Sequence, residues 1–432
     1  MLECCVVLGS DDGKSMFELG MWKACTDNDV RICDIAGAAF GAINAALFAQ
    51  GDFEKAVRLW TRASESKIFS DFYSLRRKYS ESLATPDNRQ VLALIKRIAK
   101  GNEPVLIELD GLLRSHIDEE KVRQSNIGVH IPIVSVKNYQ AMALGLDTIR
   151  PGQLVNIIKF SLLSYLFFSI NSSDYDMNIL DNAAYKAVSG KNAQSILTPY
   201  LYNAEKLIEN YPDENFIIVE NSEYLGLSYT HTFESLKRNI QLGLLDTLKA
   251  MEILKGKEYY IDLSASSNLY EWFKGHLCTP FLEDIDEKIG RMIGVHNTEI
   301  QANMLKGMEL LSQTGRYCNS DVYLSALETS AAMLYIERAK RYSPDALINE
   351  IIISANNIIQ KNLAAIQDEE NILKAMGNRK ELPSFTDESS PAINLIYFLC
   401  APRDSNIFMN FIESMKPEMK VVIITLVYLL VY

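Results

Sequence analysis

The chain has 432 residues, of which 48% are hydrophobic, 23% charged and 9% aromatic, as in an ordinary folded protein. This length suits two or three domains, and the composition excludes a disordered, a collagen-like or a small disulfide-framework protein. The formal net charge is −12, from 43 basic and 55 acidic residues. Because nucleic-acid-binding proteins usually carry a basic balance, we expect no nucleic-acid partner.

The cysteines indicate a reducing environment. There are seven of them, an odd number, and no two form a Cys-x-x-Cys pair. We interpret them as buried, reduced thiols of a cytosolic protein rather than as disulfides or zinc ligands. The five histidines are not spaced like metal ligands, so we expect neither a metal nor a cofactor.

The sequence shows no secretory signal at its N-terminus, and no apolar run reaches the ~18 residues that a membrane span needs. We therefore predict a cytoplasmic protein, and peripheral attachment to a membrane stays open. The apolar run at 421–432 is too short to span a bilayer as a helix. We interpret it as a buried terminal strand or helix, with a membrane-dipping tail as the alternative.

The first third of the chain alternates short β-branched runs with helical patterns. This order predicts an α/β fold with a mostly parallel sheet and helices on both faces. Between 53 and 125 the pattern is helical and charged, which predicts a helical insertion over one edge of the sheet. The expected strands are 4–8, 32–36, 129–136 and 216–220, and the first expected helices are 17–25 and 42–50.

After about residue 263 the strand signal fades, and apolar residues recur at helical spacing. Ser343 followed by Pro344 predicts a helix start, because a capping serine with proline at the first helical position is typical of one. We therefore expect an α/β domain at 1–263 and a separate all-helical domain at 264–432.

The most specific pattern is the sharp turn Gly37-Ala38-Ala39-Phe40-Gly41, between a predicted strand and a predicted helix. A nucleophile elbow has the same order: Gly-x-Ser-x-Gly holds a strained serine at the start of a helix. The glycines are needed because strand and helix approach too closely for side chains, and the helix start offers N–H groups to a developing oxyanion. Ala39 occupies the position of the serine and has no nucleophilic atom.

This segment resembles the patatin-like phospholipases, and the resemblance extends over residues 3–260 in order and spacing. In that family the elbow reads Gly-x-Ser-x-Gly-Ala, and an Asn-Ala-Ala-Leu helix, a Gly-Asp pair and an amphipathic helix ending in Trp follow it. The matching residues here are Gly41-Ala42-Ile43-Asn44-Ala45-Ala46-Leu47, Gly51-Asp52 and Leu59-Trp60, with weaker matches at Gly20-Met21-Trp22-Lys23-Ala24, at 161–168 and at Ile179-Leu180-Asp181-Asn182-Ala183.

The resemblance implies a three-layer α/β/α patatin-like domain that hydrolyses lipid esters with a Ser–Asp dyad and no cofactor. Its substrate would be phospholipid at a membrane surface, which we expect the 53–125 insertion to meet. Carried over by position, the nucleophile falls on Ala39 and the base on Asp181. The family's oxyanion loop falls on 10–15. The elbow glycines are Gly37 and Gly41, and the loop residues that keep the family's pattern are Gly13 and Lys14.

The sequence departs from the family at all three segments. Asp11 and Asp12 place carboxylates where an oxyanion would need stabilisation, and the base motif reads Asp-Asn-Ala rather than Asp-Gly-Gly. With Ala39 we expect no ester hydrolysis by this route. Two origins fit: one replacement of a native serine, or a pseudoenzyme that keeps the fold as a lipid-binding or assembly scaffold. In the second case the helical domain would supply a protein partner or self-association.

Two phosphate-like patterns carry less weight. The segment Gly9-Ser10-Asp11-Asp12-Gly13-Lys14-Ser15 has three residues between its glycines, whereas a P-loop has four, so we do not expect a nucleotide there. The basic run Arg76-Arg77-Lys78 is more typical of a solvated face than of a phosphate site.

Overall fold

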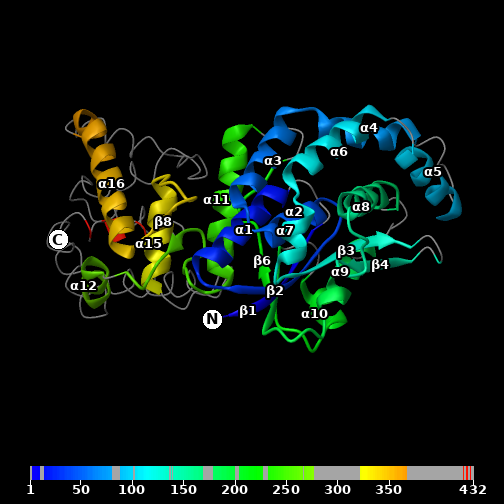
Figure 1. The fold of residues 1–432 in the computed structure, drawn as a ribbon. Coiled ribbons are helices and arrows are strands. Elements are labelled where there is room, and N and C mark those ends of the chain that lie inside the picture. The colour runs from blue at the N-terminus through cyan, green and yellow to red at the C-terminus, as the bar shows by residue number, and fades with distance from the viewer. Residues whose placement is uncertain are drawn as a thin grey trace. The chain divides into compact units, whose positions relative to one another are not determined.

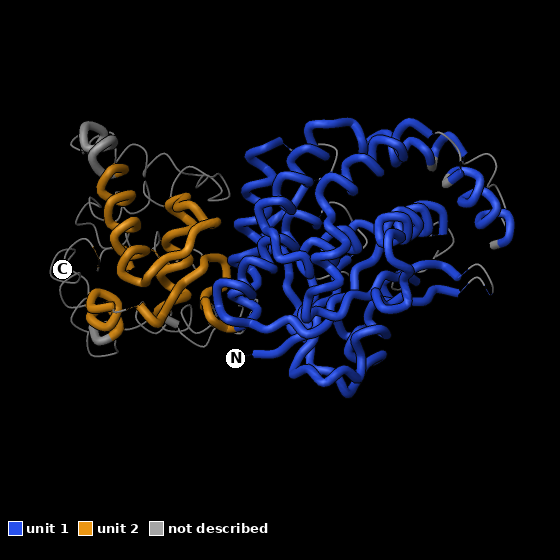
Figure 2. Tube along the Cα trace, viewed as in Figure 1, with its two compact units in different colours: residues 1–251 blue, residues 252–432 orange. Residues whose placement is uncertain are grey.

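The structure is a computed structural model. It forms two compact units, residues 1–251 and residues 252–432, and each is described by itself (Figure 2). The boundary near residue 263 stays a prediction. The described residues are 2–9, 14–79, 88–100, 103–135, 138, 140–168, 179–199, 204–226, 232–265, 267–276 and 322–366, with 422, 425, 426 and 429.

Unit 1 is built on one six-stranded sheet with the strand order β4-β3-β2-β1-β5-β6 (Figure 1). All neighbouring strands run parallel except β4, which pairs antiparallel with β3. The predicted α/β class with a mostly parallel sheet is therefore confirmed. The strands are β1 (Glu3–Leu8), β2 (Arg31–Gly37), β3 (Gly128–Val134), β4 (Ala141–Gly145), β5 (Ser195–Pro199) and β6 (Phe216–Val219).

Helices cover both faces of this sheet, so the unit has three layers. Side chains alternate along a strand, and Cys5 and Val7 of β1 pack with α9 (Ile179–Val188). Cys4 points to the opposite face, where its thiol meets Cys25 of α1 (Ser15–Asp27). On that second face α11 (Phe233–Ala250) packs along α1.

Between α2 (Phe40–Gln50) and β3, the described residues form five helices, and the last ends a few residues before β3. That this region is an insertion over one edge of the sheet stays a prediction. Further along the chain α8 (Leu154–Phe168) packs on β3, and α10 (Ala204–Asn210) joins β5 to β6. The five helices are α3 (Phe53–Glu65), α4 (Ile68–Tyr79), α5 (Asn88–Lys100), α6 (Pro104–His116) and α7 (Glu119–Gln124).

The described part of unit 2 is mostly helical and contains one small parallel sheet of two strands. The predicted helix start at Ser343 is confirmed, because its hydroxyl accepts a hydrogen bond from the Ala346 amide at 3.1 Å. The elements are α12 (Asn268–His276), α15 (Val322–Met333), α16 (Pro344–Ile366), β7 (Tyr260–Ile261) and β8 (Arg341–Tyr342).

Among the described cysteines, Cys4, Cys5 and Cys25 are buried free thiols, as predicted, whereas Cys33 is a free thiol that is only partly buried. Burial and the nearby charge of Asp34 raise the pKa of Cys5 to about 12, so it stays protonated at neutral pH. Cys278, Cys318, Cys400 and most of the 421–432 run lie outside the described residues. Among the described helices, none combines the length and the hydropathy that crossing a bilayer requires.

Candidate active site

The turn between β2 and α2 has the strained backbone of an elbow. Ala39 sits at the N-cap of α2 with φ 48° and ψ −106°, in the region that favours glycine. A Cβ on Gly37 would lie 2.1 Å from the Gly41 carbonyl oxygen, and a Cβ on Gly41 would lie 2.5 Å from the Gly9 carbonyl oxygen. Both glycines are therefore sterically required, as the sequence pattern predicts.

A serine from another helix fixes the strained residue. The Ala39 amide donates a hydrogen bond of 3.0 Å to Ser161 Oγ on α8. The Ser161 hydroxyl in turn donates to the carbonyl oxygen of Pro132 on β3, at 2.6 Å. Ser161 is fully buried, so this link between α8, β3 and the turn is closed to water. Backbone strain of about 1–3 kcal/mol persists only where surrounding contacts over-determine it, as they do here.

A buried polar network supports the turn from below. Glu18 of α1 is fully buried and accepts hydrogen bonds from the Gly9 amide (2.8 Å) and from Asn44 Nδ2 (2.7 Å). Asn44 Oδ1 accepts a further bond of 2.7 Å from Trp60 Nε1 on α3. The network ties the end of β1, α1, α2 and α3 together. Asn44 and Trp60 therefore have a structural role in this network. Glu18 shares that role, although the sequence pattern did not single it out.

Asp181 lies in the first turn of α9 and is fully buried. Just after α9, the Gln194 amide donates to the carbonyl of Glu3, at the start of β1. The C-terminal end of α9 is therefore near the amino edge of the sheet, and the helix contacts β1, β2, β3 and β4. Ala39 follows the carboxyl end of β2, and the pairing of position 39 with Asp181 stays a prediction.

The neighbours of Asp181 hold α9 in place. Burial raises the pKa of Tyr185, one turn further along, and the charge of Asp181 adds to the shift. The Tyr185 hydroxyl pairs with Thr198 Oγ1 at 2.8 Å. Asn182, where the family has glycine, accepts a hydrogen bond of 2.8 Å from the Tyr211 hydroxyl. Asn182 therefore makes a side-chain hydrogen bond that a glycine at this position could not make.

The predicted oxyanion loop is described only at its ends. Gly9 is held by Glu18, and its carbonyl accepts the Gly41 amide at 3.0 Å. Lys14 is the N-cap residue of α1. Gly13 and the two loop aspartates, Asp11 and Asp12, lie outside the described residues, so the expected charge repulsion there stays a prediction.

Aromatic side chains gather around the residue after Ala39. Phe40 is 1% exposed, and its ring centroid lies 5.3 Å from Phe69 and 5.9 Å from Phe72, both on α4. Tyr165 of α8 meets it edge-on at 6.4 Å. Ala39 itself has no exposed surface, so an ester can reach position 39 only after neighbouring side chains move.

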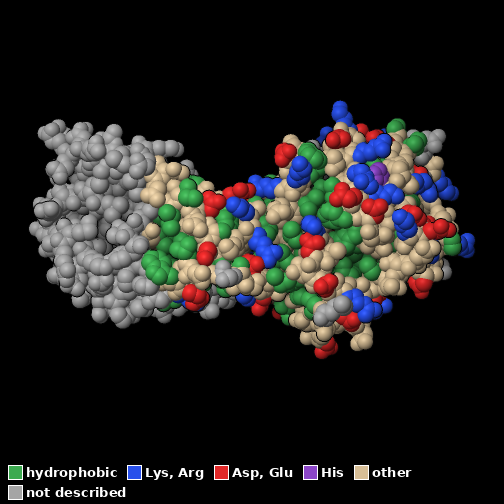
Figure 3. Space-filling view, turned by 60° about the vertical axis from the view of Figure 1, so that its left-hand side comes forward, with side chains coloured by type: hydrophobic (Ala, Val, Ile, Leu, Met, Phe, Trp, Pro, Cys, Tyr) green, Lys and Arg blue, Asp and Glu red, His purple; other side chains and the backbone are tan. Residues whose placement is uncertain are grey.

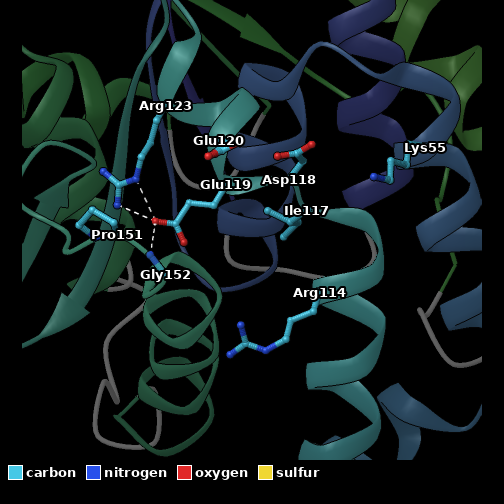
Figure 4. A pocket seen from close by; sticks show the side chains of 9 residues that line it. All are labelled: Lys55, Arg114, Ile117, Asp118, Glu119, Glu120, Arg123, Pro151 and Gly152. Carbon is cyan, nitrogen blue, oxygen red and sulfur yellow. Dashed lines mark hydrogen bonds and ion pairs between the residues drawn. The ribbon is translucent and has the colours of Figure 1, made fainter.

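A cavity of about 570 Å³ lies apart from these residues, between α6, α7 and the segment that leads into α8 (Figure 4). None of its lining residues belongs to the turn or to α9. Glu119 and Arg123, one turn apart on α7, pair at 2.7 Å in its lining. The Glu119 carboxylate also accepts the amides of Gly152 (2.9 Å) and Leu154 (3.2 Å), and so caps the start of α8.

Comparisons with known proteins add little to this geometry. No family model matches the sequence, and no curated protein matches it. Among solved structures, the type III effector protein ExoU is 12% identical over 97% of this chain and 92% of its own, with a TM-score of 0.30. The ExoU–SpcU complex of Pseudomonas aeruginosa is 14% identical over 98% and 88%, with a TM-score of 0.32.

VipD from Legionella pneumophila is 12% identical over 95% of this chain and 92% of its own, with a TM-score of 0.29. Superposition at this level carries no argument about activity.

Proposed function

We propose that unit 1 is the scaffold of a patatin-like lipid acyl hydrolase in which Ala39 occupies the nucleophile position, so the chain does not cleave esters by this route. The observation that carries the proposal is the backbone of Ala39, with φ 48° at the start of α2 between two sterically required glycines. Holding an alanine in this conformation costs about 1–3 kcal/mol. A nucleophile elbow needs this geometry.

The chemistry would use a serine at position 39 and the carboxylate at position 181. The hydroxyl introduced by Ala39→Ser attacks the carbonyl carbon of a lipid ester, and Asp181 accepts its proton. The carbon–oxygen bond to the alcohol then breaks, and the alcohol leaves with that proton. Asp181 then takes a proton from a water molecule whose oxygen attacks the acyl-serine carbonyl carbon; the bond to the serine oxygen breaks, that oxygen regains the proton, and the free fatty acid departs. The full burial of Asp181 in the first turn of α9 supports this assignment.

The test is acyl release from mixed phospholipid vesicles by the unchanged chain and by Ala39→Ser. We expect release only from Ala39→Ser, because serine supplies the missing nucleophile without changing the turn. Adding Asp181→Asn to that variant should reduce the rate by at least about 100-fold, as loss of a general base does.

Ala38→Ser is the matched control, since Ala38 is as fully buried as its neighbour but does not hold the strained conformation. It should stay inactive. If Ala39→Ser is folded by circular dichroism yet releases no acyl chain, the hydrolase proposal is wrong for this chain.

The second candidate is a binding or assembly scaffold that performs no hydrolysis. The observation that favours it is the side chain of Ala39, a methyl group in a fully closed environment. It predicts that the unchanged chain binds lipid or a protein partner, and that Ala39→Ser alters neither. Partner capture through unit 2, measured with and without residues 252–432, separates assembly from lipid binding.

A further inference from the structure

Helix α5 has two sharply different faces. It packs on α8, the helix that carries Ser161. The apolar side chains on that side are almost completely buried, so none is available to insert into a lipid bilayer. They are Val91, Leu92, Leu94, Ile95 and Ile98.

The solvent face of α5 is cationic along its whole length. Its charged residues are Arg89, Lys96, Arg97 and Lys100, all exposed, and the 13-residue helix contains no acid. Arg89 and Lys100 lie about 16 Å apart along the axis, at 1.5 Å per residue. At 3.6 residues per turn, Arg89, Lys96 and Lys100 fall within about 40° of one another around the axis, and Arg97 lies about 60° to their side, so the four charges share one face.

Neighbouring positions extend this charge. Arg77 is exposed near the end of α4, whereas the charge of Lys78 beside it is offset by Glu103, 2.9 Å away. Residues 76–100 together hold seven basic and two acidic residues, within a chain of net charge −12. On the face of unit 1 shown in Figure 3, by contrast, basic and acidic side chains are interspersed.

We propose that the exposed face of α5 docks the protein on an anionic lipid bilayer. This inference rests on the proposed function, which makes lipid the ligand of unit 1. Anionic leaflets attract basic segments at close range, and a flat surface meets all four cations at once. Because the apolar face of α5 is already buried against the protein, attachment is electrostatic. It also brings the surface next to the helix that holds the turn.

Co-sedimentation with phosphatidylcholine vesicles, with and without phosphatidylserine, tests the proposal on the chain as it stands. We expect binding only to vesicles that contain phosphatidylserine. Raising the salt from about 0.1 M to about 1 M, which shortens the Debye length from ~10 Å to ~3 Å, should abolish it. The double variant Lys96→Gln/Lys100→Gln should bind about 25-fold more weakly, at roughly fivefold per cation.

Lys121→Gln/Lys186→Gln is the matched control. It removes the same charge from exposed positions on α7 and α9, and its partition should stay within about twofold of the unchanged chain. Equal binding by the two double variants would overturn the proposal. Binding of a DNA duplex but of no vesicle would also overturn the proposal, because the ligand of this face would then be a nucleic acid.

This experiment is independent of hydrolysis. Vesicle binding by the unchanged chain needs no serine, and acyl release by Ala39→Ser is measured separately on neutral mixed micelles. If vesicle binding depends on α5 and no acyl chain is released, the docking proposal stands and the hydrolase proposal is wrong. If acyl chains are released but vesicle binding does not depend on α5, the hydrolase proposal stands and the docking proposal is wrong.

Discussion

Asn44 and Trp60 lie 16 residues apart, yet one hydrogen bond joins their side chains in the core beneath the turn. Both could be singled out from the sequence, because they recur in the pattern that identifies the elbow. Glu18 could not. It sits in a helix whose residues from Ser15 to Met21 are all buried, so no polar face marks it. Only the fold shows that this carboxylate meets the Gly9 amide and Asn44.

An alanine in place of an elbow glycine should destabilise unit 1, whereas an alanine in place of an unconfined helix glycine should not. Gly41→Ala should destabilise unit 1 by about 2 kcal/mol or more, because the new Cβ would lie 2.5 Å from the Gly9 carbonyl oxygen and backbone must shift. Gly111→Ala, in the interior of α6 with nothing within 4 Å, should instead stabilise it by about 0.5–1 kcal/mol. Urea denaturation of both variants checks this. Equal effects would mean that the close approach does not exist.

At the scale of elements, the strands that could be predicted are the ones with continuous β-branched runs. The strand β4 reads Ala-Met-Ala-Leu-Gly, which favours a helix, and only its antiparallel pairing with β3 makes it a strand. The strand β5 ends in proline and is short, so its sequence is typical of a loop. In both cases tertiary pairing overrides local preference.

Replacing Glu119 should lower the stability of unit 1 more than replacing its neighbour Glu120. The Glu119→Gln variant weakens the ion pair with Arg123 and the cap on the first amide of α8, so it should cost about 1–3 kcal/mol. Glu120→Gln, at an exposed position beside it, should change stability by less than about 0.5 kcal/mol. Thermal unfolding of both measures the difference. A larger effect of Glu120→Gln would contradict the role of Glu119 in positioning α8.

A pH dependence follows from Asp110, which joins α6 to α8. Partial burial opposes ionisation, but hydrogen bonds from Lys159 and Arg114 outweigh it and lower the pKa of Asp110. A lowered carboxyl pKa contributes stability that is complete above the unfolded value, about 3.9, and is lost as the pH falls through the folded value. Asp110→Asn should therefore lower the urea midpoint at pH 7, and the gap from the unchanged chain should narrow below about pH 4. A gap that is constant with pH would contradict the assignment.

At the scale of the whole molecule, the segment that follows α11 is bound within unit 2 by residues that lie far along the chain. Glu328 of α15 is buried and accepts the backbone amides of Lys257, Glu258 and Tyr259 at 2.8–2.9 Å. The strand β7 then pairs with β8, across about 80 residues of sequence. A local sequence pattern cannot show partners that are so distant in the chain. The sequence therefore predicts the boundary where the strand signal fades, near residue 263.

We expect residues 1–251 to fold alone, since they contain the whole six-stranded sheet and both helical layers. A fragment that ends before α11 should aggregate. In it α1 loses the helix whose backbone approaches so closely that a Cβ on Gly20 would lie 2.1 Å from the Ile240 carbonyl oxygen. Circular dichroism and denaturant titration of both fragments test this. A fragment 1–251 without a cooperative transition would show that unit 2 is required for folding.

The turn at Ala39 has a consequence for how this chain can change. Its conformation is imposed by Gly37, Gly41 and the bonds through Ser161, and none of these depends on the side chain at position 39. Alanine and serine codons can differ at a single base, so one mutation would place a hydroxyl on a backbone that already holds the elbow conformation. Under the proposed function, gaining or losing the nucleophile is then a single step that leaves the main chain unchanged.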